Sequence, residues 1–163
     1  MKAELQFRNI LKEDNIPLAK IIRDALTEYN VTRPGTVYYD ETTDHLYEVF
    51  KKEGSKYFVA TINNEVVGGA GIYPTDGLNY GTCELVKMYL SPAARGKGVG
   101  KLLMEKCIAA AKQSGYKKIY IETMSELIVA IPMYEKFGFI FLKKSMGNSG
   151  HTGCDVWMQK TLA

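Results

Sequence analysis

Apolar and polar positions alternate at the start of the chain and then change to a helical spacing. Residues 3–10 alternate, which predicts a first strand. A helical pattern follows, with Asn15 as the expected N-cap and Pro17 in the first turn. Residues 43–52 predict a second helix. The N-terminal part of the chain is therefore expected to form one strand followed by two helices.

The rest of the chain contains more strands than helices. Residues 56–62, 65–73 and 82–90 have strand-like patterns, and the Asn63-Asn64 pair between the first two is typical of a tight turn. Pro132 is expected to kink the helix in which it lies. The remaining elements are predicted as helices over residues 98–113 and 126–137, and as strands over residues 118–122, 139–143 and 155–160.

This order of elements predicts an α+β fold built on a mixed sheet. The chain has 163 residues, which suits one domain with one core, and we assign residues 1–163 to that domain. Apolar residues make up 46% and charged residues 24%, as in an ordinary globular protein. No repeat, low-complexity tract or linker divides the sequence.

Charge, cysteine content and hydropathy exclude several classes of function. The 21 basic and 18 acidic residues leave a formal charge of +3, too small and too evenly spread to indicate nucleic-acid binding. Three widely separated cysteines argue against a disulfide framework or a zinc site, so we expect no metal. The apolar runs are too short to span a membrane, and the absence of an apolar signal core predicts a cytoplasmic location.

Residues 91–101 form a glycine-rich segment between a predicted strand and a predicted helix. Glycines let backbone N–H groups approach an anion, and a helix N-terminus adds unpaired donors and a favourable dipole. This pattern favours a diphosphate site, although a flexible loop is an alternative. A P-loop needs Ser or Thr where Leu102 stands, and the spacing Gly96-x-Gly98-x-Gly100 does not match the dinucleotide-binding motif.

Two sequence blocks resemble the GNAT superfamily of acetyl-CoA-dependent N-acetyltransferases. Arg95, Gly98 and Gly100 fill the superfamily's [RQ]-x-x-G-x-[GA] motif after an apolar strand. A second block, residues 130–139, is similar to its A-x-x-x-Y-x-x-x-G-F motif. The interval between the blocks suits one helix and one strand. The resemblance covers residues 56–141 well and the N-terminal helices in outline.

The resemblance implies a GNAT-like domain with a central, mostly antiparallel sheet of about seven strands, flanked by about four helices. It implies acetyl-CoA as co-substrate and direct transfer of the acetyl group to a primary amine. The backbone of Met88 and Leu90 would bind the acetyl carbonyl and the pantetheine arm, and the loop would hold the pyrophosphate. The implied acetyl-CoA-binding residues are Met88, Tyr89, Leu90, Arg95, Gly96, Lys97, Gly98, Val99, Gly100 and Lys101.

Two side chains are the candidate catalytic residues by this resemblance. Tyr134 stands where many members place the tyrosine that protonates the CoA thiolate, although a packed tyrosine is the alternative. Glu84 stands where some members place the general base, although a surface or salt-bridged glutamate is equally compatible with the pattern. Glu84 and Met88 would share a face of the strand unless a bulge intervenes. Leu127 replaces an asparagine that the family often uses for pantetheine.

The acceptor is not specified by the sequence. A small-molecule amine is the preferred acceptor, and a protein lysine or N-terminus and a catalytically silent acetyl-CoA-binding domain are alternatives. Solvated charge is the default interpretation of Asp40, and His45 and His151 are interpreted as surface or capping residues because neither lies in a motif. A homodimer is compatible with the resemblance.

Overall fold

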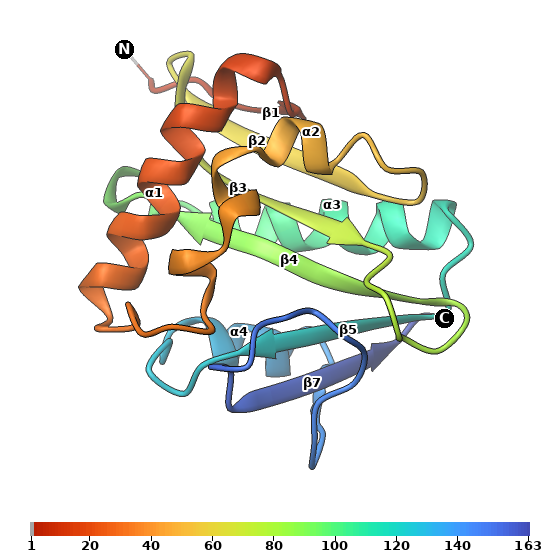
Figure 1. Ribbon diagram of the computed structural model, residues 1–163. Helices are drawn as coiled ribbons and strands as arrows, with labels where there is room; N and C mark the ends of the chain where they lie inside the picture. Colours follow the sequence, from red (N-terminus) through yellow and green to blue (C-terminus); the bar gives the residue numbers. More distant parts are fainter. Residues whose placement is uncertain (1) are drawn as a thin grey trace.

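The computed structural model describes residues 2–163, and a seven-stranded sheet runs through it (Figure 1). The strand order is β1-β2-β3-β4-β5-β7-β6, and only the β4–β5 pair is parallel. The predicted mixed, mostly antiparallel sheet is therefore confirmed. The strands are β1 (Leu5–Asn9), β2 (Lys56–Ile62), β3 (Glu65–Tyr73), β4 (Thr82–Leu90), β5 (Lys118–Thr123), β6 (Ile140–Phe141) and β7 (Val156–Thr161).

Helices cover both faces of this sheet. The α-helices are α1 (Asn15–Glu28), α2 (Leu46–Val49), α3 (Val99–Gln113) and α4 (Ala130–Lys136). Short 3₁₀ helices are η1 (Lys12–Asp14), η2 (Val37–Tyr39), η3 (Glu41–Asp44) and η4 (Pro92–Ala94). In Figure 1, α1 and α2 lie in front of the sheet, and α3 and α4 lie behind it.

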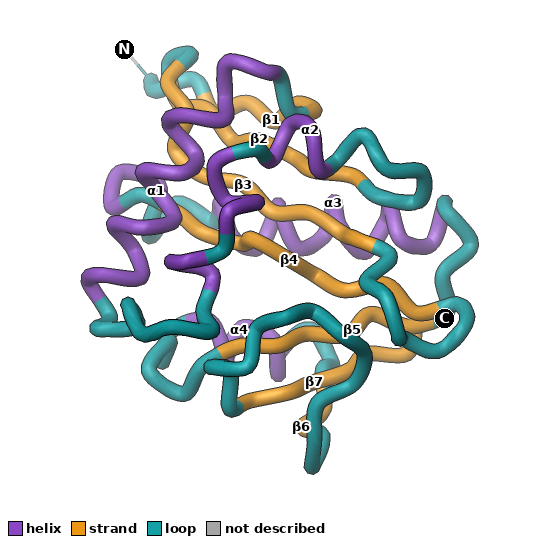
Figure 2. The backbone as a smooth tube through the Cα atoms, in the orientation of Figure 1, coloured by secondary structure: helices purple, strands orange, loops and turns teal. Residues whose placement is uncertain are grey.

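Two hydrophobic clusters explain this arrangement. On one face, Leu18, Ile22 and Leu26 of α1 pack with Tyr57 and Val59 of β2. On the other face, α3 and α4 pack against residues of the central strands, and that cluster includes Leu103, Cys107, Tyr134, Cys83 and Leu85. Because alternate side chains of a strand point to opposite faces, β2, β3 and β4 each contribute to both clusters. Figure 2 shows the strands as one layer between the helices.

The hairpin between β2 and β3 confirms the turn prediction. Asn63 and Asn64 have φ angles of 50° and 68°, the left-handed conformation that a two-residue type I′ turn requires. Asparagine tolerates this conformation better than most residues with a side chain. The turn pairs Ile62 of β2 directly with Glu65 of β3.

The second predicted helix, over residues 43–52, is wrong in length. The Asp40 carboxylate accepts a hydrogen bond from the Thr42 amide at 2.9 Å and so begins η3, and α2 then contributes a single turn. Asn15 does not act as the N-cap of α1, because its side chain instead accepts from the Tyr47 amide at 2.8 Å. The polar side chains at both positions tie the N-terminal segments to one another.

Pro132 does not kink its helix. The helix begins at Ala130, four residues later than the pattern predicts, so Pro132 lies in the first turn. Amide N–H groups in the first turn have no acceptor within the helix, and proline is therefore tolerated there.

No helix within residues 2–163 combines the length and the apolar character that crossing a bilayer requires.

Candidate active site

A β-bulge in β4 determines how the candidate residues are oriented. The register with β3 shifts between Gly69 and Gly71, and Lys87 has a φ of 52°, which is unusual for a residue with a side chain. The Tyr57 hydroxyl donates a hydrogen bond of 2.8 Å to the Lys87 carbonyl oxygen in the buried interior. This contact and the bulge place an irregular stretch of backbone in the centre of the molecule.

The bulge reverses the alternation of side chains along β4. Cys83 and Leu85 before the bulge, and Met88 and Leu90 after it, all contribute to the cluster against α3 and α4. Glu84 therefore faces the α1 side of the sheet, opposite to the Met88 side chain. The expectation that Glu84 and Met88 share a face is wrong, because the bulge that would cancel it is present.

The strands β4 and β5 separate immediately after Glu84. β4 pairs with β3 up to Leu90, whereas its pairing with β5 covers only Thr82–Glu84 opposite Lys118–Tyr120. Beyond this point the edge of β4 that faces β5 is not paired with it, and the two strands diverge in Figure 2. Backbone donors and acceptors along this edge are therefore free to bind a ligand.

A cavity of about 280 Å³ occupies this opening and reaches both faces of the sheet. Tyr29 and Val37 line it from the α1 side, and Met133 and Tyr134 line it from the α4 side. Five of the ten residues expected to bind acetyl-CoA line it as well, namely Met88, Tyr89, Leu90, Arg95 and Gly100. Leu127, the departure from the family pattern, is also on its wall. The cavity thus forms a passage through the sheet at the β4–β5 opening.

The other five expected binding residues, Gly96–Val99 and Lys101, belong to the loop and the first turn of α3. Gly98 is the N-cap of α3 with a φ of 74°, and Gly96 has a φ of 73°. A Cβ at either position would meet no atom within 4 Å, so open space lies beside both residues. No side chain caps this helix, which leaves the first-turn N–H groups available to an anion. These features fit a bound diphosphate.

The basic side chains of this loop already have protein partners. Arg95 donates two hydrogen bonds of 2.7 Å to the Glu28 carboxylate at the end of α1. Lys97 donates to the Ala93 carbonyl oxygen at 2.9 Å. The backbone amides of the loop are therefore better placed than Arg95 to provide the primary anion contacts, with the lysines as exposed countercharge.

Tyr134, in α4, lines the larger cavity, with 6% of its surface exposed. Burial raises the pKa of its phenol well above the ordinary value, so the hydroxyl stays protonated at physiological pH. Its ring packs near Phe139, with ring centroids 6.1 Å apart. Tyr134 therefore both packs in the core and presents a neutral proton donor to the cavity.

Glu84 is a buried carboxyl group and not a surface residue. Only 3% of its surface is exposed, and its Oε1 accepts a hydrogen bond of 2.6 Å from the Thr75 hydroxyl. Burial raises its pKa from 4.5 to about 7, against the opposing effect of the Thr75 hydrogen bond. No ion pair forms between Glu84 and a lysine or arginine in the described part of the chain, so the salt-bridged alternative does not apply.

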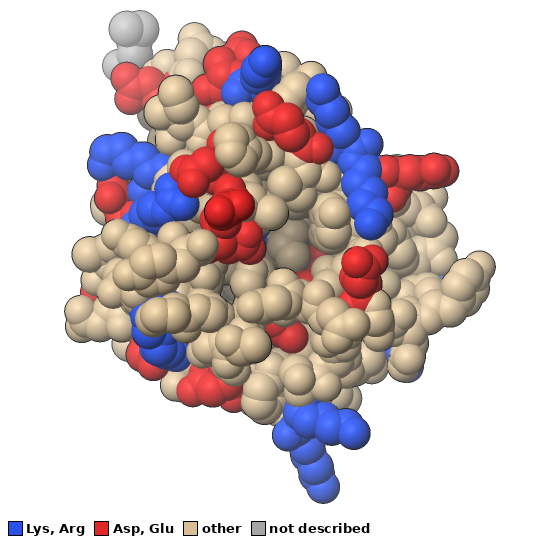
Figure 3. Space-filling model, viewed as in Figure 1, with Lys and Arg blue, Asp and Glu red and all other residues tan. Residues whose placement is uncertain are grey.

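A second cavity of about 200 Å³ adjoins the first and shares Glu84, Val86, Lys87 and His151 with it. Its other walls come from the η2–α2 region, the end of β3 and the loop that precedes β7. Figure 3 shows a hollow near the middle of the face that carries α1 and α2, with acidic side chains at its rim. This cavity is the candidate acceptor side of the site.

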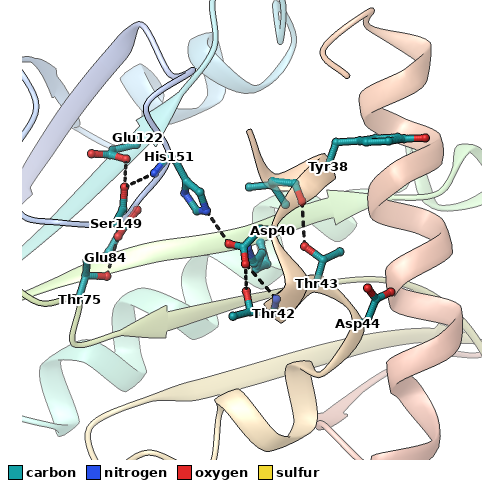
Figure 4. A network of polar contacts seen from close by, with 12 residues as sticks. Tyr38, Asp40, Thr42, Thr43, Asp44, Thr75, Glu84, Glu122, Ser149 and His151 are labelled. Atoms are coloured by element: carbon teal, nitrogen blue, oxygen red, sulfur yellow. Dashed lines mark hydrogen bonds and ion pairs between the residues drawn. The ribbon is translucent and has the colours of Figure 1, made fainter. Parts of the chain in front are cut away.

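Asp40, Lys87 and His151 form a polar cluster at this junction that sequence reasoning missed. Figure 4 shows Asp40 and His151 of this cluster. Asp40 Oδ2 lies 2.7 Å from His151 Nε2 and 3.1 Å from Lys87 Nζ. Burial opposes ionisation of Asp40, but the hydrogen bond with His151 and the Lys87 charge hold its pKa far below the usual range. The interpretations of Asp40 as solvated charge and of His151 as a surface residue are therefore wrong.

One group of potential metal-ligating atoms occurs at the same place. An oxygen of Glu84, an oxygen of Glu122 and a ring nitrogen of His151 all lie within 4.8 Å of one another. The protein itself engages these groups: Glu122 accepts hydrogen bonds from the hydroxyls of Tyr120 and Ser149, and His151 contacts Asp40. We therefore interpret the group as a hydrogen-bonded network.

Comparisons with known proteins agree with the two sequence blocks and with the fold. Residues 19–139 match the model of the Acetyltransferase (GNAT) family. The chain belongs to the GNAT acetyltransferase family. It is 39% identical over 156 residues to the uncharacterized N-acetyltransferase YjgM of Escherichia coli (strain K12), a match that covers 95% of this chain and 93% of that protein. The chain is accordingly an N-acetyltransferase, as the sequence blocks predict.

Solved structures of GNAT proteins share the whole fold. A GNAT acetyltransferase from Staphylococcus aureus Mu50 superposes with a TM-score of 0.86 at 18% identity, covering 98% of this chain and 100% of that one. The putative acetyltransferase yncA from Salmonella typhimurium, solved with its cofactor acetyl-CoA, gives a TM-score of 0.76 at 23% identity over 98% and 95% of the two chains. At these identities the likeness concerns the fold.

Proposed function

We propose that this GNAT enzyme transfers the acetyl group of acetyl-CoA directly to the primary amine of a small molecule. The observation that carries the proposal is the passage between β4 and β5. A buried carboxyl group, Glu84, and a neutral phenol, Tyr134, line that one cavity from opposite faces of the sheet. A carboxyl group and a phenol on the two sides of a single opening support roles as proton acceptor and proton donor.

The loop after β4 and the start of α3 would hold acetyl-CoA, which supplies the activated acetyl group as a thioester. The backbone amides around Gly96 and Gly98 would bind the pyrophosphate, because no side chain caps this end of α3 and open space lies beside both glycines. The unpaired edge of β4 after the bulge, at Met88 and Leu90, would orient the pantetheine arm and donate to the carbonyl oxygen as negative charge develops there.

Glu84 would accept a proton from the acceptor's ammonium group, and Tyr134 would protonate the departing sulfur. An amine attacks only when it is neutral, so the ammonium must lose a proton inside the site. The raised pKa of Glu84, about 7, makes its carboxylate a better proton acceptor than an ordinary glutamate. The chain's cysteines do not offer an obvious acyl carrier, since burial raises the pKa of Cys83 and of Cys154 to about 12.

The anchoring of one loop beside the acceptor side supports a small acceptor over a peptide. The loop before β7 is held to the loop after α1 by a hydrogen bond of 2.8 Å from the Gly153 amide to the Gly35 carbonyl oxygen. Near its other end, the Asn148 amide donates to the Asp76 carbonyl oxygen at 2.7 Å. Residues of this loop line the smaller cavity, so a wall of that cavity is fixed at two points and leaves less room for an extended peptide.

The proposal is tested by measuring thiol release from acetyl-CoA with a panel of small amines, polyamines and lysine peptides, while CoA binding is measured in parallel. Turnover with a small amine and none with peptides supports it. Turnover confined to peptides would favour protein acetylation instead. Binding of CoA without turnover on any member would favour the silent acetyl-CoA-binding alternative.

The proton roles are tested with two conservative variants. Glu84→Gln should lower kcat/KM by about 10²-fold or more and remove the decline of activity below about pH 7, because the base must be deprotonated to act. Glu65→Gln, at an exposed position at the start of β3, is the matched control and should behave as wild type. Undiminished turnover in Tyr134→Phe would exclude Tyr134 as the acid.

A further inference from the structure

A base as deeply buried as Glu84 needs a route by which its proton returns to solvent. Only 3% of its surface is exposed, and its one hydrogen-bond partner in the described structure, Thr75, is a hydroxyl that donates to it. Once Glu84 has taken a proton from the acceptor, it must release that proton before the next turnover. A neighbouring group that can both accept and donate a proton, and that reaches solvent, would provide the route.

His151 is placed to do this. A ring nitrogen of His151 and a carboxylate oxygen of Glu84 lie within 4.8 Å of each other, a separation that one bridging water molecule spans. His151 lines both cavities at their junction. Its side chain is 14% exposed, whereas that of Lys87, on the same side of Glu84, is 6% exposed. His151 is thus the more accessible of these two neighbours.

Asp40 holds the imidazole in this position. Its Oδ2 lies 2.7 Å from His151 Nε2, and its Oδ1 accepts hydrogen bonds from the Thr42 amide and hydroxyl at 2.9 and 2.6 Å. Figure 4 shows His151 directed toward Asp40, with Thr42 on the far side of the carboxylate. An ionised carboxylate at one ring nitrogen stabilises an imidazolium and leaves the other nitrogen to exchange a proton. Asp40 also forms an ion pair with Lys87, so its negative charge interacts with both Lys87 and His151.

Several charged or titratable groups surround His151. They are Asp40 before η3, Glu84 and Lys87 of β4, Glu122 of β5, and Cys154 of its own loop. Burial keeps the Cys154 thiol protonated, with its pKa raised to about 12. The carboxylates outnumber the cations here, which favours the transient presence of a positive imidazolium.

We propose that His151, oriented by Asp40, receives the proton that Glu84 has taken from the acceptor and passes it to solvent. The step rests on the proposed function, in which Glu84 is the base. The proton leaves the Glu84 carboxyl group, which becomes a carboxylate again, and joins a neutral ring nitrogen of His151. The resulting imidazolium, paired with Asp40, then loses a proton to water or to a buffer molecule. No electrons are transferred, and the heavy-atom bonds of both side chains stay intact.

The experiment compares the chain's two histidines. His151→Gln removes the proposed proton carrier, and His45→Gln, at an exposed position outside both cavities, is the matched control. Turnover is measured at fixed pH and ionic strength with increasing imidazole concentration. We expect kcat of His151→Gln to fall at least about tenfold in dilute non-exchanging buffer and to recover as imidazole rises. The acceptor KM should change by less than about twofold, and His45→Gln should match wild type.

Asp40→Asn provides a second test if His151→Gln disturbs the loop. The asparagine keeps the shape of the side chain but cannot stabilise an imidazolium by charge. We expect kcat of Asp40→Asn to fall less than that of His151→Gln and to recover with imidazole. This result would support proton transfer through His151. Melting temperature and CoA affinity, measured for each variant, identify any loss that arises from misfolding.

Two results would overturn the proposed proton transfer through His151. One is unchanged turnover in His151→Gln while Glu84→Gln is impaired, and this result leaves the proposed function standing. The other is a fall in turnover that no buffer restores and that accompanies a raised acceptor KM, which would make His151 a binding residue. Unchanged turnover in Glu84→Gln would contradict the role of Glu84 as the base. The proposed proton transfer through His151 would then fail as well, because it depends on that role.

Discussion

The two ends of the site are built in different ways. The proposed acetyl-CoA end consists of consecutive residues, from the end of β4 through η4 to the first turn of α3. The proposed acceptor end consists of side chains from separate segments: Asp40 before η3, Lys87 in β4 and His151 in the loop before β7. Asp40 and His151 are 111 positions apart in the sequence. The first end uses mainly backbone groups, and the second uses ionisable side chains.

This difference explains why one end has a sequence motif and the other does not. Backbone amides bind a diphosphate whatever the side chains are, provided that glycines allow the conformation, so the requirement falls on a short run of residues. Ionisable side chains can be supplied from any element that reaches the site. The acceptor end can therefore change without disturbing the acetyl-CoA end.

The largest expected effect is a pH-dependent difference in folding stability between wild type and Glu84→Gln. The pKa of Glu84 rises from 4.5 to about 7 on burial, and each pH unit of difference corresponds to about 1.4 kcal/mol. A raised carboxyl pKa means that the folded state binds the proton more tightly. The wild type should therefore lose up to roughly 3 kcal/mol of stability relative to Glu84→Gln as pH rises from 4.5 to 7. Denaturant titrations at several pH values measure this difference.

The exposed Glu65→Gln is the control for that titration. Its stability relative to wild type should show no comparable change over the same pH range, because the residue is exposed at the start of β3. If the difference in stability between wild type and Glu84→Gln stayed constant at every pH, it would contradict the raised pKa of the buried Glu84 carboxyl group.

At the acetyl-CoA end, Gly98→Ala should weaken CoA binding by about tenfold or more, because a Cβ restricts the left-handed N-cap and enters the open space beside the loop. Gly115→Ala is the matched control at the other end of α3, with a φ of 84° and equally open surroundings. Both variants should lose about 1 kcal/mol of stability. Calorimetric titration with CoA distinguishes them, and equal affinities would refute the proposed role of this loop.

The bulge that joins the two ends is probed by Tyr57→Phe. Loss of the buried hydrogen bond to the Lys87 carbonyl oxygen should cost about 1–2 kcal/mol and lower kcat roughly several-fold, because the backbone at Met88 is no longer held in place. Tyr116→Phe removes a similar bond, of 2.7 Å to the Gly54 carbonyl oxygen, far from the site. It should lose comparable stability at wild-type kcat. If both variants lose kcat equally, the bulge has no special role.

The smallest expected effect is at the ion pair between Arg95 and Glu28. Both side chains are partly exposed and screened by solvent, so Glu28→Gln should have little effect on stability. Release of Arg95 should tighten CoA binding by about two- to threefold at low salt, and less at high salt. Asp24→Asn, which breaks the exposed Lys20–Asp24 pair on the same helix, should leave CoA affinity unchanged. Weaker binding in Glu28→Gln would show that the pair supports the loop.

The sequence alone predicted the features that depend on local chemistry. The seven strands, the Asn63-Asn64 turn, the glycine loop and the position of Tyr134 follow from patterns a few residues long. The periodicity of apolar residues indicates the type of an element and its apolar face, and turn residues indicate the backbone conformation at their own positions. The family resemblance added the expected roles of those residues. These expectations needed no knowledge of how distant segments meet.

The tertiary structure decided what depends on distant contacts. The bulge at Lys87 reverses the faces of Glu84 and Met88, and it is maintained partly by Tyr57 from β2. His151 acquires its place beside Glu84 only because the loop before β7 folds back over β4 and onto the segment around Asp40. The pKa of Glu84 likewise depends on burial by several elements together. A sequence pattern carries no record of these distances, because burial and charge pairing are properties of the packed chain.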